Sequence, residues 1–187
     1  MREEIQKTVA ILKAGGVILY PTDTIWGLGC DASNAKAVKK VYDIKKRNEA
    51  KSLIALVDSE VRLERTIEEV PEVAWDLIEF TEKPLTIIYD NPIGIAKNAI
   101  NKDKSLGIRI VNDKFCKELI RNLNNPIIST SANISGTPQA NCFAEISEEI
   151  KNSVDHIVNL RQEELQQKQS SMIIKLDASG LINIIRK

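Results

Sequence analysis

Residues 126–133 read Pro-Ile-Ile-Ser-Thr-Ser-Ala-Asn, a short apolar run that passes directly into small polar side chains. An apolar run of this length that begins at a proline is typical of a buried strand. A second stretch has the same form, since the apolar residues 17–20 are followed by Pro21-Thr22-Asp23-Thr24. Each stretch predicts a strand that ends in polar residues, and ligand sites of α/β sheets gather just past such strand ends.

The rest of the chain alternates between helical and strand patterns. Apolar residues at helical spacing predict a first helix that Gly15-Gly16 ends. Residues 27–29, Gly-Leu-Gly, are expected in a loop. This alternation predicts one α/β domain over residues 1–187 with a largely buried sheet, and the close succession of the last strands predicts that part of the sheet is antiparallel. Further helices are expected after residues 33–34, 71 and 112–113 and around 145–150, and further strands at 53–57, 85–89, 106–111, 156–160, 171–176 and 181–185.

Length and composition limit the classes of protein to which the chain can belong. Its 187 residues are 43% hydrophobic, which is enough for a sizeable core, and 26 basic residues balance 26 acidic ones. A strongly basic nucleic-acid-binding surface is therefore not expected. The first residues are mostly charged rather than apolar, and no apolar run approaches the roughly 20 residues that span a bilayer. We therefore expect a cytoplasmic protein without membrane contact.

Metal binding and general-base catalysis by histidine find little support. Cys30, Cys116 and Cys142 are too far apart in the sequence for a metal knuckle, so no metal held by the protein is predicted. His156 is the single histidine, and its alternating apolar neighbours indicate a strand in which it has a structural or surface role. A mechanism that relies on histidine as the base is therefore disfavoured.

Two short segments far apart in the sequence are predicted to form halves of one nucleotide site. Lys45-Lys46-Arg47 closes a predicted helix, and Ser131 and Asn133 close a predicted strand. Where the backbone is extended, residues i and i+2 point the same way, so each segment would present a paired face. Two cations and two small polar groups suit a polyphosphate. Since the chain has neither a P-loop motif nor a G-x-G-x-x-G fingerprint, a site for ATP would be of another kind.

Three motifs in this order resemble the YrdC/Sua5 (TsaC-type) family of threonylcarbamoyl-AMP synthases, in its short single-domain form. They are Tyr-Pro-Thr-Asp-Thr-Ile-Trp-Gly-Leu-Gly at 20–29, Lys45-x-Arg47, and Ser-Thr-Ser-Ala-Asn-Ile-Ser-Gly at 129–136. The resemblance extends from about Gly15 to Arg186. It implies a twisted mixed parallel and antiparallel sheet flanked by helices, with a large concave cationic cavity. Supporting elements are Pro84-Leu85-Thr86, Gly107-Ile108-Arg109-Ile110, Ser171 and Arg186.

The resemblance also implies a reaction and the residues that carry it. L-threonine, bicarbonate and ATP would give threonylcarbamoyl-AMP and pyrophosphate, with Mg²⁺ entering with ATP, for the t6A modification of tRNA at position 37. The receiver would be a TsaD-type transferase with TsaB-type and TsaE-type proteins, and a contact with tRNA itself is possible. The implied residues are Lys45, Arg47, Ser131 and Asn133 for catalysis and nucleotide binding, Arg109 and Arg186 for nucleotide binding, and Thr22, Thr24, Lys51 and Ser171 for binding threonine.

Structural interpretations of the same residues stay open at this stage. Trp26, which stands where the family usually has Tyr, is equally consistent with a cavity wall and with a core aromatic. The other interpretations are a helix end for Lys45 and Arg47, a turn for Ser131 and Asn133, local hydrogen bonds for Thr22 and Thr24, ion pairs for Arg109 and Arg186, and a strand-edge hydroxyl for Ser171.

Three alternative functions are also open. The first is a non-catalytic paralogue of the YciO group, whose members tend to lose the K-x-R and S-x-N motifs that this chain keeps. The second is an RNA-binding module, against which stand the zero net charge and an aromatic content of only 4%. The third is a carbamoyl-transfer domain of the hydrogenase-maturation type, which belongs to longer chains with zinc-finger cysteines.

Overall fold

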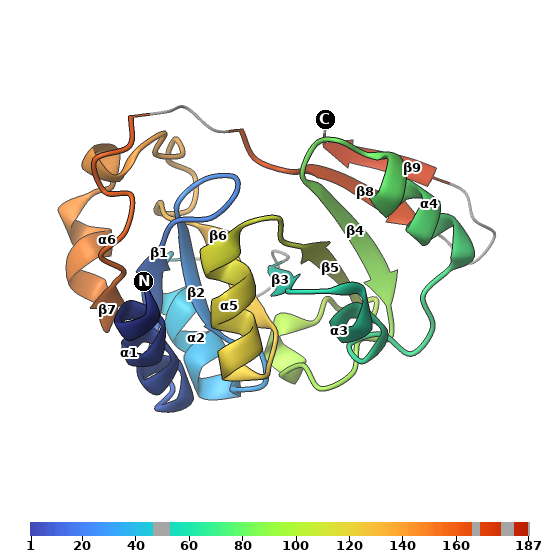
Figure 1. Ribbon diagram of the computed structural model, residues 1–187, viewed down its shortest axis with the longest axis horizontal. Coiled ribbons are helices and arrows are strands. Elements are labelled where there is room, and N and C mark those ends of the chain that lie inside the picture. The colour runs from blue at the N-terminus through green and yellow to red at the C-terminus, as the bar shows by residue number, and fades with distance from the viewer. Residues whose placement is uncertain (47–52, 166–168, 177–181, 187) are drawn as a thin grey trace.

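The computed structural model describes residues 1–46, 53–165, 169–176 and 182–186 (Figure 1). The strands are β1 (Ile18–Tyr20), β2 (Gly27–Asp31), β3 (Ile54–Val57), β4 (Leu85–Asp90), β5 (Ser105–Ile110), β6 (Ile127–Ser131), β7 (His156–Ile157), β8 (Met172–Leu176) and β9 (Ile182–Arg186). The helices are α1 (Arg2–Lys13), α2 (Ala35–Ile44), α3 (Glu60–Glu64), α4 (Glu72–Phe80), α5 (Lys114–Leu123) and α6 (Glu148–Ser153), with short 3-10 turns η1 (Lys97–Ala99) and η2 (Phe143–Glu145).

In this described part of the chain, the strands form one nine-stranded mixed sheet in the order β7-β1-β2-β6-β3-β5-β4-β8-β9. The pairs β1–β7, β3–β5 and β4–β8 are parallel. The pairs β1–β2, β2–β6, β3–β6, β4–β5 and β8–β9 are antiparallel. The predicted α/β fold with a mixed sheet is therefore confirmed, although antiparallel pairing extends through the centre of the sheet as well as the last strands.

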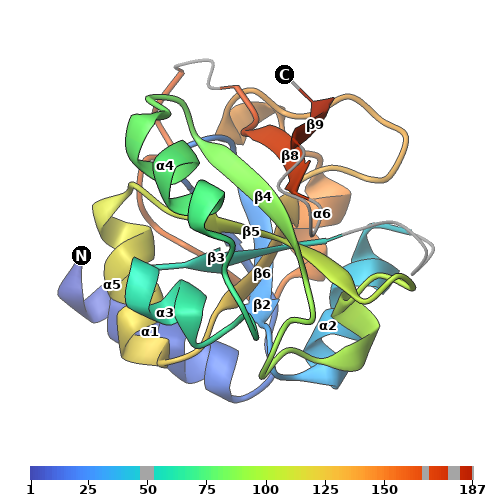
Figure 2. The ribbon, with the colours of Figure 1, turned by 90° about the vertical axis from the view of Figure 1, so that its right-hand side faces the viewer.

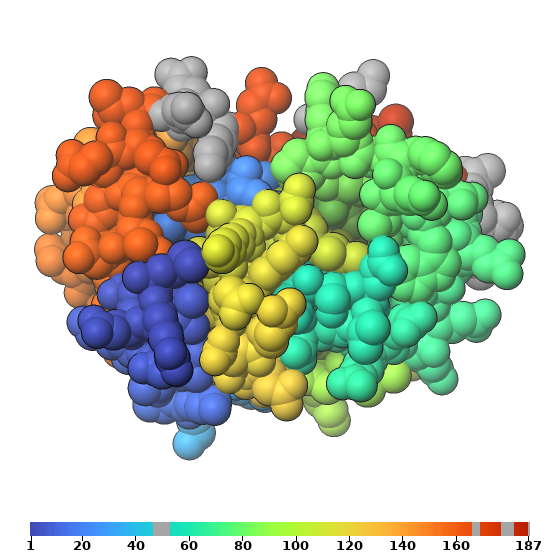
Figure 3. Space-filling model, viewed as in Figure 1, coloured from blue at the N-terminus to red at the C-terminus, as the bar shows by residue number. Residues whose placement is uncertain are grey.

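Helices cover the two faces of the sheet with separate apolar clusters. Side chains alternate along each strand, so neighbouring residues enter opposite clusters. One face packs against α1 and α5, which contact each other directly, and the other packs against α2 (Figures 1 and 2). Side chains of α5 lie between those of α1 and those of α3 on this face of the molecule (Figure 3). None of the described helices has the length and apolar character needed to cross a bilayer.

Two of the predicted helix starts rest on side-chain caps. The Asn34 side chain accepts hydrogen bonds from the first backbone amides of α2, and Asp113 does the same for α5 by accepting from the Cys116 amide. These short side chains satisfy amide groups that have no partner inside the helix. At the other end, α5 stops at Asn124, whose φ of 62° lies in the left-handed region.

The loop expected at residues 27–29 is wrong, because Gly27 to Asp31 form β2, paired with β1 and β6. The glycines are needed for close packing rather than for a turn. A Cβ on Gly29 would lie 2.6 Å from Cε1 of Tyr20, and a Cβ on Gly27 would lie 3.1 Å from Oγ of Ser129. The strand expected at 156–160 is also shorter, and α3 was not predicted.

A hydrogen bond between His156 and Glu4 joins β7 to the start of α1 and gives a prediction about pH. Nε2 of His156 lies 2.7 Å from Oε1 of Glu4, which also accepts from the Asn159 amide. Burial disfavours the Glu4 carboxylate, but these hydrogen bonds and the nearby charges outweigh it and hold the pKa of Glu4 below its usual value. The stabilisation is therefore present at neutral pH and disappears as pH falls through the lowered pKa.

We expect Glu4→Gln to lower the free energy of unfolding by about 1 kcal/mol at pH 7. The difference from wild type should shrink as pH falls toward 3, because the wild-type carboxyl becomes increasingly protonated as pH falls through its lowered pKa. Urea unfolding at pH 7 and pH 3 measures this difference in the free energy of unfolding. Glu3→Gln is the matched control, because Glu3 is exposed in the same helical turn. A difference that grows on acidification would contradict the prediction.

Candidate active site

The loop between β1 and β2 presents two buried threonines. Oγ1 of Thr22 donates to the Ile25 carbonyl at 2.7 Å, lies 2.9 Å from Oγ1 of Thr24, and accepts from the Thr24 amide at 3.0 Å. Local backbone hydrogen bonding, the structural alternative for these residues, is therefore present. Both side chains also line a cavity, so their hydroxyls form its wall with an orientation that the loop sets.

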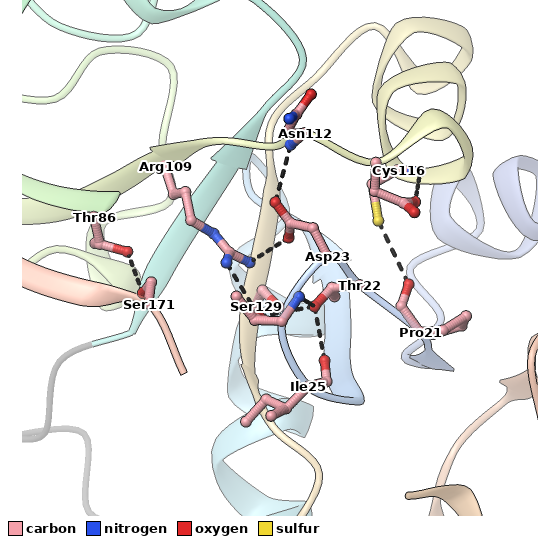
Figure 4. Close-up of polar contacts among 12 residues, drawn as sticks. Pro21, Thr22, Asp23, Ile25, Thr86, Arg109, Asn112, Cys116, Ser129 and Ser171 are labelled. Carbon is pink, nitrogen blue, oxygen red and sulfur yellow. Dashed lines mark hydrogen bonds and ion pairs between the residues drawn. The ribbon is translucent and has the colours of Figure 1, made fainter. Parts of the chain in front are cut away.

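Arg109 on β5 links this loop to the sheet (Figure 4). Its side chain is 2% exposed, Nη1 donates to Oγ1 of Thr24 at 3.1 Å, and Nη2 lies 3.2 Å from Oδ1 of Asp23. The other carboxylate oxygen of Asp23 accepts from the Asn112 amide at 2.9 Å. An ion pair is thus present for Arg109, as the structural alternative anticipated. Nε of Arg109 is buried without a hydrogen-bond partner among the described residues, and the residue also lines the cavity.

The opposite wall is formed by β8, β9 and the residues just before β8, and β4 pairs with β8 beside it. Oγ1 of Thr86 lies 2.7 Å from Oγ of Ser171, and both residues are buried (Figure 4). Nε and Nη2 of Arg186 donate to the Ser171 carbonyl at 3.0 and 2.7 Å. Partial burial and the nearby charge of Arg109 lower the pKa of Arg186. Arg186 is therefore held by a backbone carbonyl. The ion pair that was the structural interpretation of this residue is not found among the described residues.

Lys45 lies against the end of β6, where the two predicted halves of the nucleotide site meet. The residue is 2% exposed, and Nζ donates to the carbonyls of Ser131 at 2.6 Å and Asn133 at 2.7 Å. Oγ of Ser131 donates to Oδ1 of Asn133 at 2.5 Å, and the Asn133 amide donates to the Ser131 carbonyl at 3.0 Å, so the two side chains meet across a turn rather than along an extended strand. The Lys45 carbonyl in turn accepts from the Ser135 amide. A buried ammonium therefore anchors the turn that follows β6.

Lys45 closes α2, as the sequence predicted, but the extended backbone that a paired face of Lys45 and Arg47 would require is not present at Lys45. Lys45 caps the helix in the right-handed helical region, and Lys46 has φ of 49°. The Lys45 amide still donates to the Val41 carbonyl, so the helical backbone continues to Lys45. Arg47 and Lys51 lie outside the described residues.

The cavity encloses about 290 Å³ on the face of the sheet that carries Ser129 and Ser131, a volume near the lower end for small-molecule sites. Its lining includes six of the residues assigned from the sequence, whereas Lys45 and Asn133 contact Ser131 without lining it. Trp26 forms part of the wall and packs against Phe143 with ring centroids 4.9 Å apart. The six are Thr22, Thr24, Arg109, Ser131, Ser171 and Arg186.

The structure adds polar residues that the motifs did not single out. Ser129, Thr130, Gln139 and Ser170 also line the cavity. Ser129 could have been found, since it lies two residues before Ser131 and strand alternation places both on one face. Thr130 lies within the quoted motif at 129–136, whereas nothing in the sequence pattern pointed to Gln139 or Ser170. In the described parts of the chain, no three His, Cys, Asp or Glu side chains come together as metal ligands.

Comparison with known proteins identifies relatives over nearly the whole chain. The model of the Sua5/YciO/YrdC family, described as "Telomere recombination", matches residues 10–187. A threonylcarbamoyl-AMP synthase of Hahella chejuensis is 32% identical over 153 residues, which are 81% of this chain and 83% of the relative. A relative from Methanocaldococcus jannaschii is 34% identical over 187 residues, covering 97% of this chain and 86% of its own.

Solved structures show the same architecture. The Sua5 of P. abyssi complexed with L-threonine superposes with a TM-score of 0.82 at 25% identity, over 92% of this chain and 50% of that one. The chain thus spans about half the length of that protein. The YciO of E. coli superposes with a TM-score of 0.82 at 23% identity, over 100% of this chain and 90% of that one. With the matched family model and these relatives, the chain belongs to the Sua5/YciO/YrdC family.

Proposed function

We propose that this protein is an L-threonylcarbamoyladenylate synthase, which condenses L-threonine, bicarbonate and ATP into threonylcarbamoyl-AMP and pyrophosphate. The observation that carries the proposal is the buried Lys45 ammonium bound to the Ser131 and Asn133 turn at the edge of the cavity. A buried lysine is costly unless a ligand or protein group uses its charge. The threonine complex of the P. abyssi relative and the name of the H. chejuensis relative support the same substrate class.

The chemistry proposed for the site has two steps. The amine of threonine first takes up the carbon of bicarbonate and water is lost, which leaves an N-carboxylate. One oxygen of this carbamate then attacks the α-phosphorus of ATP, and the bond to the β-phosphate oxygen breaks to release pyrophosphate. Because the carbamate is already an anion, this second step needs no strong side-chain base. It needs neutralisation and alignment of anions that repel one another.

The residues divide between the two kinds of substrate. Lys45, with Ser131 and Asn133, would hold the phosphates, and Arg47 would join them from outside the described residues. Mg²⁺ would enter as part of the nucleotide substrate, and the hydroxyl and amide oxygens of Ser131 and Asn133 are of the ligand type that it prefers. These side chains lie 2.5 Å apart, so one ion or one phosphate could reach both.

The second group of residues surrounds the amino acid. Thr22, Thr24 and Ser171 provide hydroxyls for threonine, with Lys51 outside the described residues. Arg109 and Arg186 would supply the positive field for the nucleotide. The product would pass to a TsaD-type transferase with TsaB-type and TsaE-type proteins for the t6A modification of tRNA, in the cytoplasm.

Release of pyrophosphate tests the proposal directly. Purified protein is incubated with Mg²⁺, ATP and bicarbonate, with and without L-threonine, and pyrophosphate is measured. We expect release that depends on threonine and that Arg47→Ala abolishes, with Lys46→Ala as the control. Folded protein that binds ATP but releases no threonine-dependent pyrophosphate would contradict the proposal. Such a result would favour the non-catalytic alternative on the same fold.

Binding of RNA is the second candidate function, and it makes a different prediction. A site that holds polyphosphate could also hold the backbone of tRNA, and such binding weakens steeply as salt rises. The balanced charge of the chain and its 4% aromatic content give this function weaker support. Salt-sensitive binding of tRNA without turnover of ATP would favour it.

A further inference from the structure

Arg161 joins the segment after β7 to the loop between β1 and β2. The Val158 amide donates to the Leu19 carbonyl at 2.9 Å, which continues the parallel pairing of β7 with β1 toward this loop. Nη1 of Arg161 lies 3.0 Å from Oδ2 of Asp113 and donates a long hydrogen bond of 3.4 Å to the Thr22 carbonyl. Arg161 does not itself line the cavity, so the side chain acts on the loop rather than on a molecule held in the cavity.

The backbone at Arg161 takes a conformation that is disfavoured for any residue with a Cβ. Its φ of 55° lies in the left-handed region, which glycine enters without a steric penalty. Such a conformation persists where the surroundings hold it in place. The guanidinium supplies holding contacts here, because the side chains of Arg161 and Asp113 are only 22% and 15% exposed. An ion pair sheltered to this degree is screened less by salt than a pair on the open surface.

Asp113 ties this link to the start of α5. Its Oδ1 caps the helix by accepting from a backbone amide of the first turn at 2.8 Å, whereas Oδ2 faces Arg161. The neighbouring Asn112 amide donates to Oδ2 of Asp23 at 2.9 Å (Figure 4). Two adjacent residues at the start of α5 therefore fix the loop between β1 and β2 at two points, at Asp23 directly and at Thr22 through Arg161.

This loop carries two of the hydroxyls that line the cavity. Oγ1 of Thr22 donates to the Ile25 carbonyl at 2.7 Å and accepts from the Thr24 amide at 3.0 Å, so its orientation follows the backbone of the loop. A shift of the Thr22 carbonyl, which Arg161 holds, moves this hydroxyl with it. Displacements of about 1 Å are enough to weaken a binding geometry.

We propose that Arg161 is a positioning residue for the amino-acid half of the site, where it holds the loop between β1 and β2 so that the hydroxyls of Thr22 and Thr24 face the bound amino acid. The inference rests on the proposed function for the identity of that ligand. The phosphate half, at Lys45 and the turn after β6, shares no hydrogen bond or ion pair with Arg161 among the described residues. Loss of Arg161 is therefore expected to impair the use of threonine and to leave the use of ATP nearly unchanged.

Two replacements separate the side chain of Arg161 from its backbone conformation. Arg161→Met removes the guanidinium alone, whereas Arg161→Gly also relieves the disfavoured φ. We expect both variants to raise KM for threonine about tenfold in threonine-dependent pyrophosphate release, as for one lost interaction with a charged group, and to leave KM for ATP within twofold. Arg161→Lys keeps the charge without the fork of donors and should restore part of the loss. A glycine variant with wild-type constants would overturn the inference, because the turn alone would then position the loop.

Asp113→Asn completes a double-mutant cycle with Arg161→Met. The asparagine oxygen can still cap α5, but the charge that faces Arg161 is lost. If Asp113 acts through Arg161, the double variant will be no worse than Arg161→Met alone. Arg121→Met is the matched control, since the Arg121 side chain is 60% exposed and pairs with Glu118 on the same helix, and every constant should stay within twofold. Thermal unfolding is measured for all variants. Fully additive effects, or an equal rise in KM for ATP and for threonine, would overturn the inference.

Hydrogen exchange separates this inference from the proposed function, because it needs no substrate. The Thr24 amide, which Oγ1 of Thr22 holds, is expected to exchange about tenfold faster in Arg161→Gly than in wild type. The Val38 amide, which donates to the Asn34 carbonyl in α2, should keep its rate. If wild type releases no threonine-dependent pyrophosphate, the proposed function fails, and exchange still decides whether Arg161 holds the loop. An unchanged rate at Thr24 overturns the inference even if the enzyme is active.

Discussion

Replacing Lys45 with methionine is expected to lower kcat/KM for ATP by about 10²-fold or more, as for the loss of a pre-oriented charged donor in an active site. Methionine keeps the length and apolar stem of lysine but removes the ammonium. The carbonyls of Ser131 and Asn133 then lose a donor at 2.6 and 2.7 Å, and the turn that carries both side chains loses its anchor. Pyrophosphate release at varied ATP concentrations measures the effect.

Lys46→Met is the matched control for this experiment. The Lys46 side chain is 64% exposed and pairs with the exposed Glu149, an ion pair of small expected value. We expect activity within twofold of wild type. Circular dichroism and unfolding temperature establish that the Lys45 variant is folded, and a folded Lys45→Met protein with nearly full activity would refute the assignment of Lys45 to the phosphates.

Replacing Arg109 with methionine is expected to cost about 3–5 kcal/mol of the free energy of unfolding. The Arg109 and Asp23 side chains are only 2% and 11% exposed, so the variant leaves a carboxylate nearly buried without its cation. Thr24 also loses a donor, which loosens the loop between β1 and β2. Denaturant unfolding at neutral pH measures the loss, and activity should fall with it.

The double variant Asp23→Asn with Arg109→Met keeps the prediction testable if the single variant fails to fold. Removing both charges eliminates the unpaired carboxylate, so the double variant should be more stable than Arg109→Met alone. Lys39→Met is the control, since Lys39 and Asp43 are 63% and 64% exposed, and its effect should stay within about 0.5 kcal/mol. Equal stability of Arg109→Met and wild type would show that the ion pair of Arg109 with Asp23 contributes nothing to the free energy of unfolding.

Much of the fold followed from local patterns that need no tertiary information. The apolar runs before Pro21 and up to Ser131 predicted β1 and β6. The candidate caps at 33–34 and 112–113 marked the starts of α2 and α5, and the structure selects Asn34 and Asp113. Patterns of this kind act within one strand or one helical turn, so the chain near each residue is enough to reveal them. The family motifs also brought Lys45 and Ser131 into one hypothesis, and the structure places them in contact.

Tertiary packing decided what local patterns could not. Gly27 and Gly29 resemble a loop in sequence, yet they form a central strand because the ring of Tyr20 needs the space that a Cβ would fill. The partner of Arg109 could not be chosen from the sequence, because Asp23 lies 86 residues away and approaches only when the sheet assembles. The hydrogen bond between the Tyr20 and Ser129 hydroxyls depends on the strand order β1-β2-β6. These two residues are 109 positions apart in the sequence, and antiparallel strand pairing brings them together. Residues that act at a distance in sequence are positioned by the sheet, whereas residues that shape their own turn are visible in the chain itself.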